Sequence, residues 1–304
     1  MEGKHISIAT QEAKKLIEDR RDGIIVPLKT PWEKLNKSIV GGFEWGTMAT
    51  IGGLSGAGKT AFIAQLYRNL HALNEGQQFI VLFFTFEMTA AKLILRDIIA
   101  NTKIYREYLL SALGHTISTQ QLISVDAFLE SITDLEIYFI EDTQTPEAYI
   151  LICREYYKKY KKKIVAIGDH SLLFDGVNED NDRGMLVRLS KQIMQLKREE
   201  WSMHFLLSQL NRDIEKAERR HPCSPMNYPD KGCLFASDAL YQASDYVLIL
   251  HRPYLLKFVG DTYGPDKLST NIEDTYIHII KQREGVPSIL RMRANFKEMR
   301  IESD

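Results

Sequence analysis

The stretch "IGGLSGAGKTAF" (residues 51–62) decides the fold, because it contains a glycine, four further residues and then glycine, lysine and threonine. Glycines let a loop backbone close around an anion with its N–H groups pointing inward, and a helix that begins just after the loop adds positive partial charge. In such a pattern the lysine contacts the β- and γ-phosphates, and the threonine hydroxyl ligates Mg²⁺. We therefore expect ATP and Mg²⁺ to bind here, through Gly53, Ser55, Gly56, Ala57, Gly58, Lys59, Thr60 and Ala61.

Strand and helix patterns alternate along the chain on both sides of this loop. Apolar runs predict strands at 48–53, 78–86, 135–142, 163–169 and 204–210, and amphipathic spacing predicts helices at 58–73, 89–100, 146–160 and 184–200. Three further strand patterns, at 245–252, 275–282 and 288–296, follow with no long helix between them. The sequence predicts an α/β fold with a mainly parallel, twisted sheet, helices on both faces and antiparallel strands at its C-terminal edge.

The overall composition is that of an ordinary globular protein. The 304 residues are 44% hydrophobic and 26% charged, with a formal net charge of −1, which neither requires nor excludes a nucleic-acid partner. Three scattered cysteines argue against a disulfide scaffold and for a reducing compartment. Neither an apolar run of about 18 residues nor a signal region is present. We expect a cytoplasmic protein, bacterial or made by a virus in its host, with no membrane partner.

The N-terminal segment has a pattern of its own. Residues 9–22 predict a helix with a narrow apolar stripe formed by Ala9, Ala13, Leu16 and Ile17. So narrow a stripe cannot bury itself, so we expect the helix to pack on its own domain or on a neighbour. A proline-containing extended stretch follows. We divide the chain into a linker helix with its extended linker (1–30) and one domain (31–304).

Two acidic residues follow predicted strands at the edge where ligands bind in open α/β sheets. Asp169 closes "IVAIGD" and is the candidate to hold the metal's water shell, although a helix cap or loop aspartate would also fit. Glu87 follows "VLFFTF" and is the candidate to activate water, although it could also cap the next helix. Gln209 ends "HFLLSQ" and could sense the γ-phosphate or be a simple polar strand end.

Taken together, these stretches resemble the C-terminal ATPase domain of DnaB-type hexameric replicative helicases, which has the RecA-like fold of P-loop NTPases. The resemblance covers about residues 28–300 and rests on six stretches in the family's order. They are "TPWEKLNKSIVGGFEWGTMATIGGLSGAGKT", "VLFFTFEM", "IYFIEDTQTPEAYI", "IVAIGDHSLLF", "LLSQLNR", and "ASDYVLILHR" with "IIKQREG". The family's separate N-terminal collar domain has no counterpart here, so we expect a minimal motor.

The resemblance implies roles for individual residues. Lys59 and Thr60 would bind phosphate and Mg²⁺, Glu87 would activate water, Asp169 would hold the metal shell and Gln209 would sense the γ-phosphate. Lys281 and Arg283, in "KQREG", match a basic finger that reaches into a neighbouring subunit's site in that family. Without the resemblance they would be a solvated strand end. The family also implies a hexameric ring docked through the linker helix, single-stranded DNA as the track, and primase or a loader as partners.

The segment expected to contact DNA departs from the family's pattern. Residues 234–245 read "LFASDALYQASD", so Phe235 replaces an arginine and Asp238 a glycine. Lys231 and Gly232 lie just upstream and could substitute, and Phe235 could stack on a base. Arg183 could face the ring's channel or lie on a solvated helix face.

Three functions follow from these observations. The first is an ATP-driven replicative helicase motor that moves on single-stranded DNA. The second is a RecA-fold, DNA-dependent ATPase that acts in recombination or loading without unwinding. The third is a ring ATPase that no longer binds DNA. The altered segment 234–245 keeps the second and third open, and DNA-stimulated ATP turnover with fork unwinding would distinguish all three.

Overall fold

A nine-stranded sheet forms the centre of the protein, whose computed structural model describes residues 3–114, 117–170, 174, 182–220, 227–234, 237–258, 262–283 and 285–303. Its order is β11-β10-β9-β6-β1-β5-β4-β2-β3. The strands are β1 (Thr47–Gly53), β2 (Phe79–Thr85), β3 (Ile137–Ile140), β4 (Lys163–Asp169), β5 (Ser202–Gln209), β6 (Tyr246–His251), β9 (Asp274–Gln282), β10 (Ser288–Asn295) and β11 (Arg300–Ser303). The six strands from β3 to β6 in this order are parallel, and β9, β10 and β11 are antiparallel. The predicted α/β sheet with an antiparallel C-terminal edge is confirmed.

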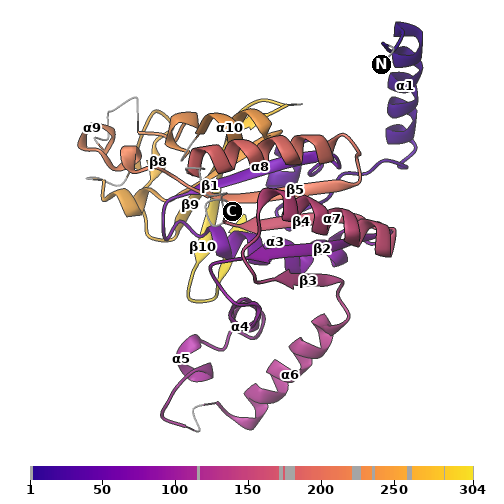
Figure 1. The fold of residues 1–304 in the computed structure, drawn as a ribbon. Coiled ribbons are helices and arrows are strands. Elements are labelled where there is room, and N and C mark those ends of the chain that lie inside the picture. The colour runs from indigo at the N-terminus through magenta and orange to yellow at the C-terminus, as the bar shows by residue number, and fades with distance from the viewer. Residues whose placement is uncertain are drawn as a thin grey trace.

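Helices cover both faces of this sheet (Figure 1). One core joins alternate residues of β2, β4 and β5 to α3 (Lys59–Leu73) and α2 (Glu33–Ser38). A second core joins the intervening residues of the same strands to α7 (Pro146–Tyr160), α8 (Asp182–Lys197) and α10 (Ser237–Ala243). Because successive side chains of a strand point to opposite faces, an unbroken apolar run such as 79–84 supplies both cores at once.

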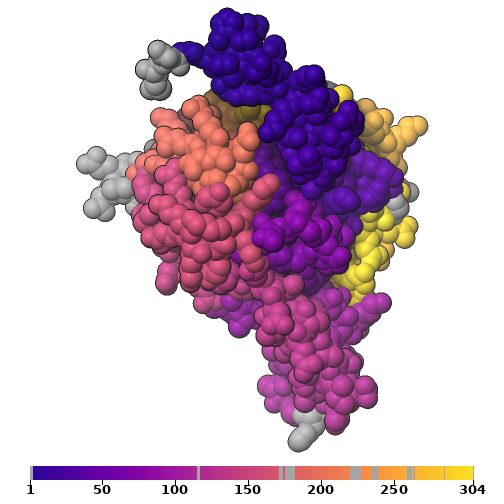
Figure 2. Space-filling model, turned by 90° about the vertical axis from the view of Figure 1, so that its right-hand side faces the viewer, coloured from indigo at the N-terminus to yellow at the C-terminus, as the bar shows by residue number. Residues whose placement is uncertain are grey.

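A helical arm extends from the body after β2 (Figures 1 and 2). It contains α4 (Ala90–Thr102), α5 (Arg106–Leu109) and α6 (Thr119–Thr133), and it has a small core of its own. The buried members of that core are Ile98, Ile104 and Val125. The arm corresponds to the mostly helical segment 101–134 of the sequence.

The N-terminal helix α1 (Ile6–Arg21) stands away from the sheet (Figures 1 and 2). It begins three residues before the predicted 9–22, because the His5 ring accepts the Ser7 N–H and caps it. None of its residues is buried, and Ile17 is 69% exposed. Leu28 then pairs with Phe43, and the Trp32 ring stacks on Phe62. The division at residue 30 stays a prediction.

Short elements complete the fold. They are 3₁₀ turns at Arg212–Glu215, Lys231–Cys233 and Pro253–Leu256, the helix α9 (Ala217–Arg220), and a hairpin of β7 (Thr262–Tyr263) and β8 (Leu268–Ser269). β11 and this hairpin were not predicted. Over the ranges that the structure describes, every helix is too short or too polar to span a lipid bilayer.

Candidate nucleotide-binding and catalytic site

The glycine-rich loop connects the end of β1 to the start of α3. Gly58 has φ +97°, and a Cβ there would lie 2.6 Å from a ring carbon of Phe296, so both conformation and space call for glycine. Lys59 opens the helix, and its ammonium donates to the carbonyl oxygens of Gly53 (2.7 Å) and Leu54 (3.1 Å). Burial lowers the pKa of Lys59, and Asp169 and Glu87 oppose that shift.

The other candidates meet this loop because parallel strands end at one edge. Gly53 pairs with Gln209, and Thr85 pairs with Asp169, so both strand pairs finish level with each other. A cavity of about 890 Å³ lies at this edge. Its lining includes the predicted residues Ser55, Gly56, Gly58, Lys59, Thr60, Ala61, Glu87, Asp169 and Gln209.

Asp169 is the buried acid of this cavity, with 3% of its surface exposed. Burial, and then the charge of Glu87, raise the pKa of Asp169 to about 6, while Lys59 and Arg96 act in the opposite direction. A buried carboxylate with incomplete charge compensation, beside the Thr60 hydroxyl, is the oxygen donor set that Mg²⁺ takes. These residues therefore fit a divalent cation.

Glu87 is exposed and faces the cavity rather than capping the helix that follows it. Thr89 is the N-cap residue of α4 and makes no side-chain cap hydrogen bond, and the Ala90 N–H donates to the Glu141 carboxylate instead. Gln209 is also exposed, with its amide nitrogen 3.4 Å from Nε2 of His170. Both side chains are thus available to a ligand.

Three further cavity residues were not expected from the sequence. The Arg252 guanidinium lies 4.2 Å from the centre of the Phe296 ring and donates to the Gly56 carbonyl oxygen (2.9 Å) and to that of Ile272 (2.8 Å). Arg96, on α4, lines the cavity beside the two acids. Arg252 directly follows an apolar strand, which is the one local signal that could have marked it.

Lys281 and Arg283 are the predicted catalytic residues that do not reach this cavity. They lie at the far end of β9, beside the start of β6, whereas the glycine-rich loop lies beside the end of β6. The Lys281 ammonium donates to the carbonyl oxygens of Tyr241 (2.5 Å) and Gln242 (3.3 Å), and Arg283 pairs with Asp245 at 2.7 Å.

The candidate DNA contacts are only partly described. Lys231 and Gly232 form an exposed 3₁₀ turn, and the Gly232 carbonyl oxygen accepts from the Asn211 side chain at 2.6 Å. That turn therefore lies just beyond the end of β5. Arg183 lies in the first turn of α8. Phe235 lies outside the described residues.

Comparison with known proteins places the chain in a family. The family model for the DnaB-like helicase C terminal domain matches residues 27–303. The Replicative DNA helicase DnaB of Geobacillus stearothermophilus is 24% identical over 288 residues, covering 93% of this chain and 57% of the relative. The chain thus spans little more than half the length of that curated relative.

Solved structures show the same fold. A solved structure of an isolated ATPase domain matches with a TM-score of 0.82 at 19% identity, over the whole of both chains. A DnaB-like replicative helicase, from a structure that concerns its interactions with primase, matches with a TM-score of 0.80 at 17% identity, over 99% of this chain and 67% of that one. With the family model matching nearly its full length, the chain belongs to the family of DnaB-like helicase C-terminal domains.

Proposed function

We propose that this chain is the ATP-driven motor of a replicative DNA helicase, which assembles as a six-membered ring and translocates on single-stranded DNA. The observation that carries the proposal is the meeting of the glycine-rich loop, Glu87, Asp169 and Gln209 around one cavity. Family membership supports the same activity. A cytoplasmic location, in a bacterium or a virus-infected cell, goes with this role.

Each cavity residue has a task in this proposal. Lys59 binds the β- and γ-phosphates, while the backbone N–H groups of residues 53–58 surround them. Thr60 and Asp169 hold Mg²⁺, which neutralises charge on the phosphate oxygens when bound. Glu87 orients and deprotonates the attacking water, and Gln209 hydrogen-bonds the γ-phosphate and responds to its loss.

The basic finger, Lys281 with Arg283, acts in the site of a neighbouring subunit. Tyr246 pairs with Gln282 and Leu250 with Gly53, so four residues of β6, roughly 13 Å, separate the finger from its own loop along the strand. A rigid strand of that length keeps Arg283 out of its own cavity. Donated across an interface, such an arginine accelerates turnover by about 10³–10⁵-fold.

The remaining assignments concern assembly and partners. The exposed apolar stripe of α1 docks on the adjacent subunit, which makes residues 1–30 a linker and residues 31–304 the motor domain. Lys231, Gly232, Phe235 and Arg183 are the proposed DNA contacts. Primase is a proposed partner because one of the similar solved structures is that of a DnaB-like replicative helicase and its interactions with primase.

ATP turnover measured with and without single-stranded DNA, followed by a fork-unwinding assay, tests the proposal. We expect DNA to stimulate turnover and the fork to be unwound, with both lost in Lys59→Ala. Lys37→Ala, which changes an exposed lysine of α2, is the matched control and should behave as wild type. Stimulated turnover without unwinding would instead indicate a recombination or loading ATPase, and turnover indifferent to DNA a ring ATPase that has lost DNA binding.

A further inference from the structure

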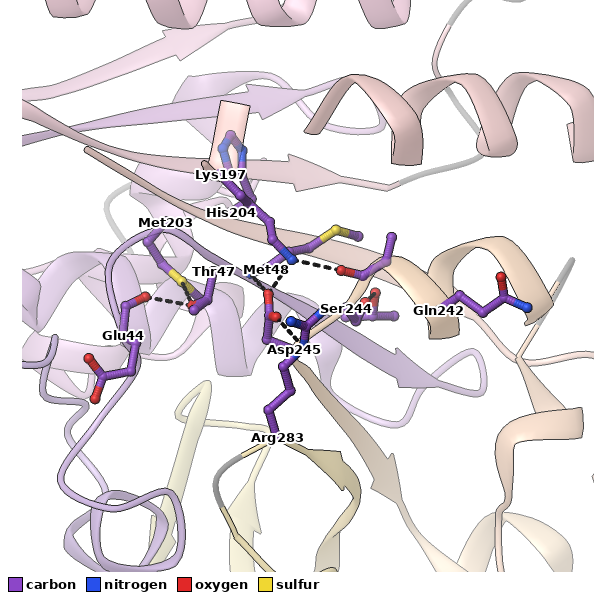
Figure 3. Close-up of polar contacts among 12 residues, drawn as sticks. Glu44, Thr47, Met48, Lys197, Met203, His204, Gln242, Ser244, Asp245 and Arg283 are labelled. Atoms are coloured by element: carbon purple, nitrogen blue, oxygen red, sulfur yellow. Dashed lines mark hydrogen bonds and ion pairs between the residues drawn. The ribbon is translucent and has the colours of Figure 1, made fainter. Parts of the chain in front are cut away.

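Asp245 is a buried carboxylate that joins three separate parts of the chain (Figure 3). It follows α10 and directly precedes β6. One oxygen, Oδ2, accepts the Met48 N–H at 2.8 Å and the Lys197 ammonium. The other, Oδ1, pairs with Nε of Arg283 at 2.7 Å. Lys197 and Arg283 thus approach the same carboxylate through different oxygens.

The second cation of the finger docks on the same structure. The Lys281 ammonium donates to the carbonyl oxygens of Tyr241 and Gln242 and lies 4.8 Å from the centre of the Tyr241 ring. Those carbonyls belong to the last turn of α10, where the negative end of a helix favours a cation. The end of α10 and Asp245 therefore form one docking site for both finger residues.

The two cations on Asp245 differ in exposure. The Lys197 side chain is 10% exposed and also donates to the Ala243 carbonyl oxygen, at 2.8 Å. The Arg283 side chain is 57% exposed. An exposed guanidinium can leave while Lys197 continues to compensate the buried carboxylate, so its departure leaves no unpaired charge.

We propose that Asp245 is the positioning residue of the basic finger. It orients Arg283 at the edge of the chain, ready to reach the nucleotide of the adjacent subunit, and Lys197 keeps the carboxylate paired after the guanidinium leaves. This inference rests on the proposed ring motor with a finger that acts between subunits. A bland alternative is that Asp245 only holds β1, α8 and β6 together.

Mixed assemblies separate the two roles. The double variant Lys197→Met/Asp245→Asn removes the buried charges together, which avoids an unpaired lysine. Lys197→Met alone is the matched control, because it leaves Asp245 free to hold Arg283. Each chain is assayed for DNA-stimulated ATP turnover and for binding of a fluorescent ATP analogue, first alone and then mixed in equal amounts with Glu87→Ala or Arg283→Ala chains.

We expect the double variant to bind the analogue normally and to lose about 10²-fold in turnover, because a misplaced reacting group costs about that much. Lys197→Met should stay within about threefold of wild type. Glu87→Ala chains should restore turnover to the double variant by lending a correctly held finger. Arg283→Ala chains should not, because neither chain then supplies one.

The control mixture is Glu87→Ala with Arg283→Ala. Failure of this mixture to recover turnover would contradict the cross-subunit finger itself. Recovery there, with none when Glu87→Ala chains meet the double variant, would overturn the role of Asp245 alone. Unchanged turnover in the double variant would do the same.

Discussion

At the residue scale, His204 makes stability depend on pH. It is fully buried between Tyr149 and Ser202, and burial lowers its pKa to about 3. In the unfolded chain a histidine has a pKa of about 6.5, so the stabilisation is complete above that pH and is lost as the pH falls toward about 3. At pH 5 the loss is about 2 kcal/mol relative to pH 7.5.

The substitution His204→Gln keeps polar atoms for Tyr149 and Ser202 but removes the titrating group. We expect the free energy of unfolding of this variant to fall about 2 kcal/mol less than that of wild type between pH 7.5 and pH 5. Urea unfolding followed by circular dichroism measures both. His5→Gln, at an exposed position, should keep the wild-type dependence. Equal pH dependence in His204→Gln and wild type would rule out His204 as the source.

A second residue-scale prediction concerns Arg252, which holds the glycine-rich loop in place. Hydrogen bonds from a charged group contribute about 1.5–3 kcal/mol, and this guanidinium donates to both Gly56 and Ile272. Arg252→Met should keep the stem packed on Phe296 but loosen the loop. We expect the dissociation constant of ATP to rise about tenfold, measured by calorimetric titration, with partial recovery in Arg252→Lys. An unchanged dissociation constant would mean that the loop needs no such support.

At the scale of elements, the helical arm should unfold separately from the sheet. Its core has few buried members, among them Val125, which is 7% exposed. Val125→Asp places an unpaired charge there and should strip the amides of residues 104–133 of protection from hydrogen exchange, leaving those of β1 and β4 protected. Ile123→Asp, on the exposed side of the same helix, is the control and should leave protection unchanged. Loss of protection throughout the chain would show that arm and sheet unfold together.

The same scale explains what sequence patterns could and could not predict. The glycine-rich loop and the apolar runs of β2 and β4 carry their structure locally, so sheet class and most elements were predicted. β11 was not, because it is stabilised by contacts with segments more than 200 residues away: the Trp32 indole donates to the Ile301 carbonyl oxygen, and the Gln65 side chain accepts the Ile301 N–H. Arg252 was missed for the same reason. Glu87, Asp169 and Gln209 were found because strand ends are visible in sequence; their catalytic roles stay predictions.

At the scale of the whole molecule, α1 should contribute to assembly and not to folding. It has no buried residue, and its described tie to the body is the ion pair of Arg20 with Glu44, at 2.5 Å. A partly exposed pair of this kind is worth about 0–1 kcal/mol. Deleting residues 1–22 should therefore change the free energy of unfolding by less than about 1 kcal/mol.

Light scattering in the presence of ATP, Mg²⁺ and single-stranded DNA measures assembly. The full chain should have a mass near six times 35.0 kDa, and the shortened chain a mass near one. Leu16→Glu/Ile17→Glu should act like the deletion, because charges on the stripe cannot be buried against a neighbour. Lys14→Ala/Lys15→Ala, on the exposed polar side, should assemble as the full chain does. A ring that persists without α1 would place subunit contacts on the sheet domain alone, and the finger would then have to find its neighbour without the linker.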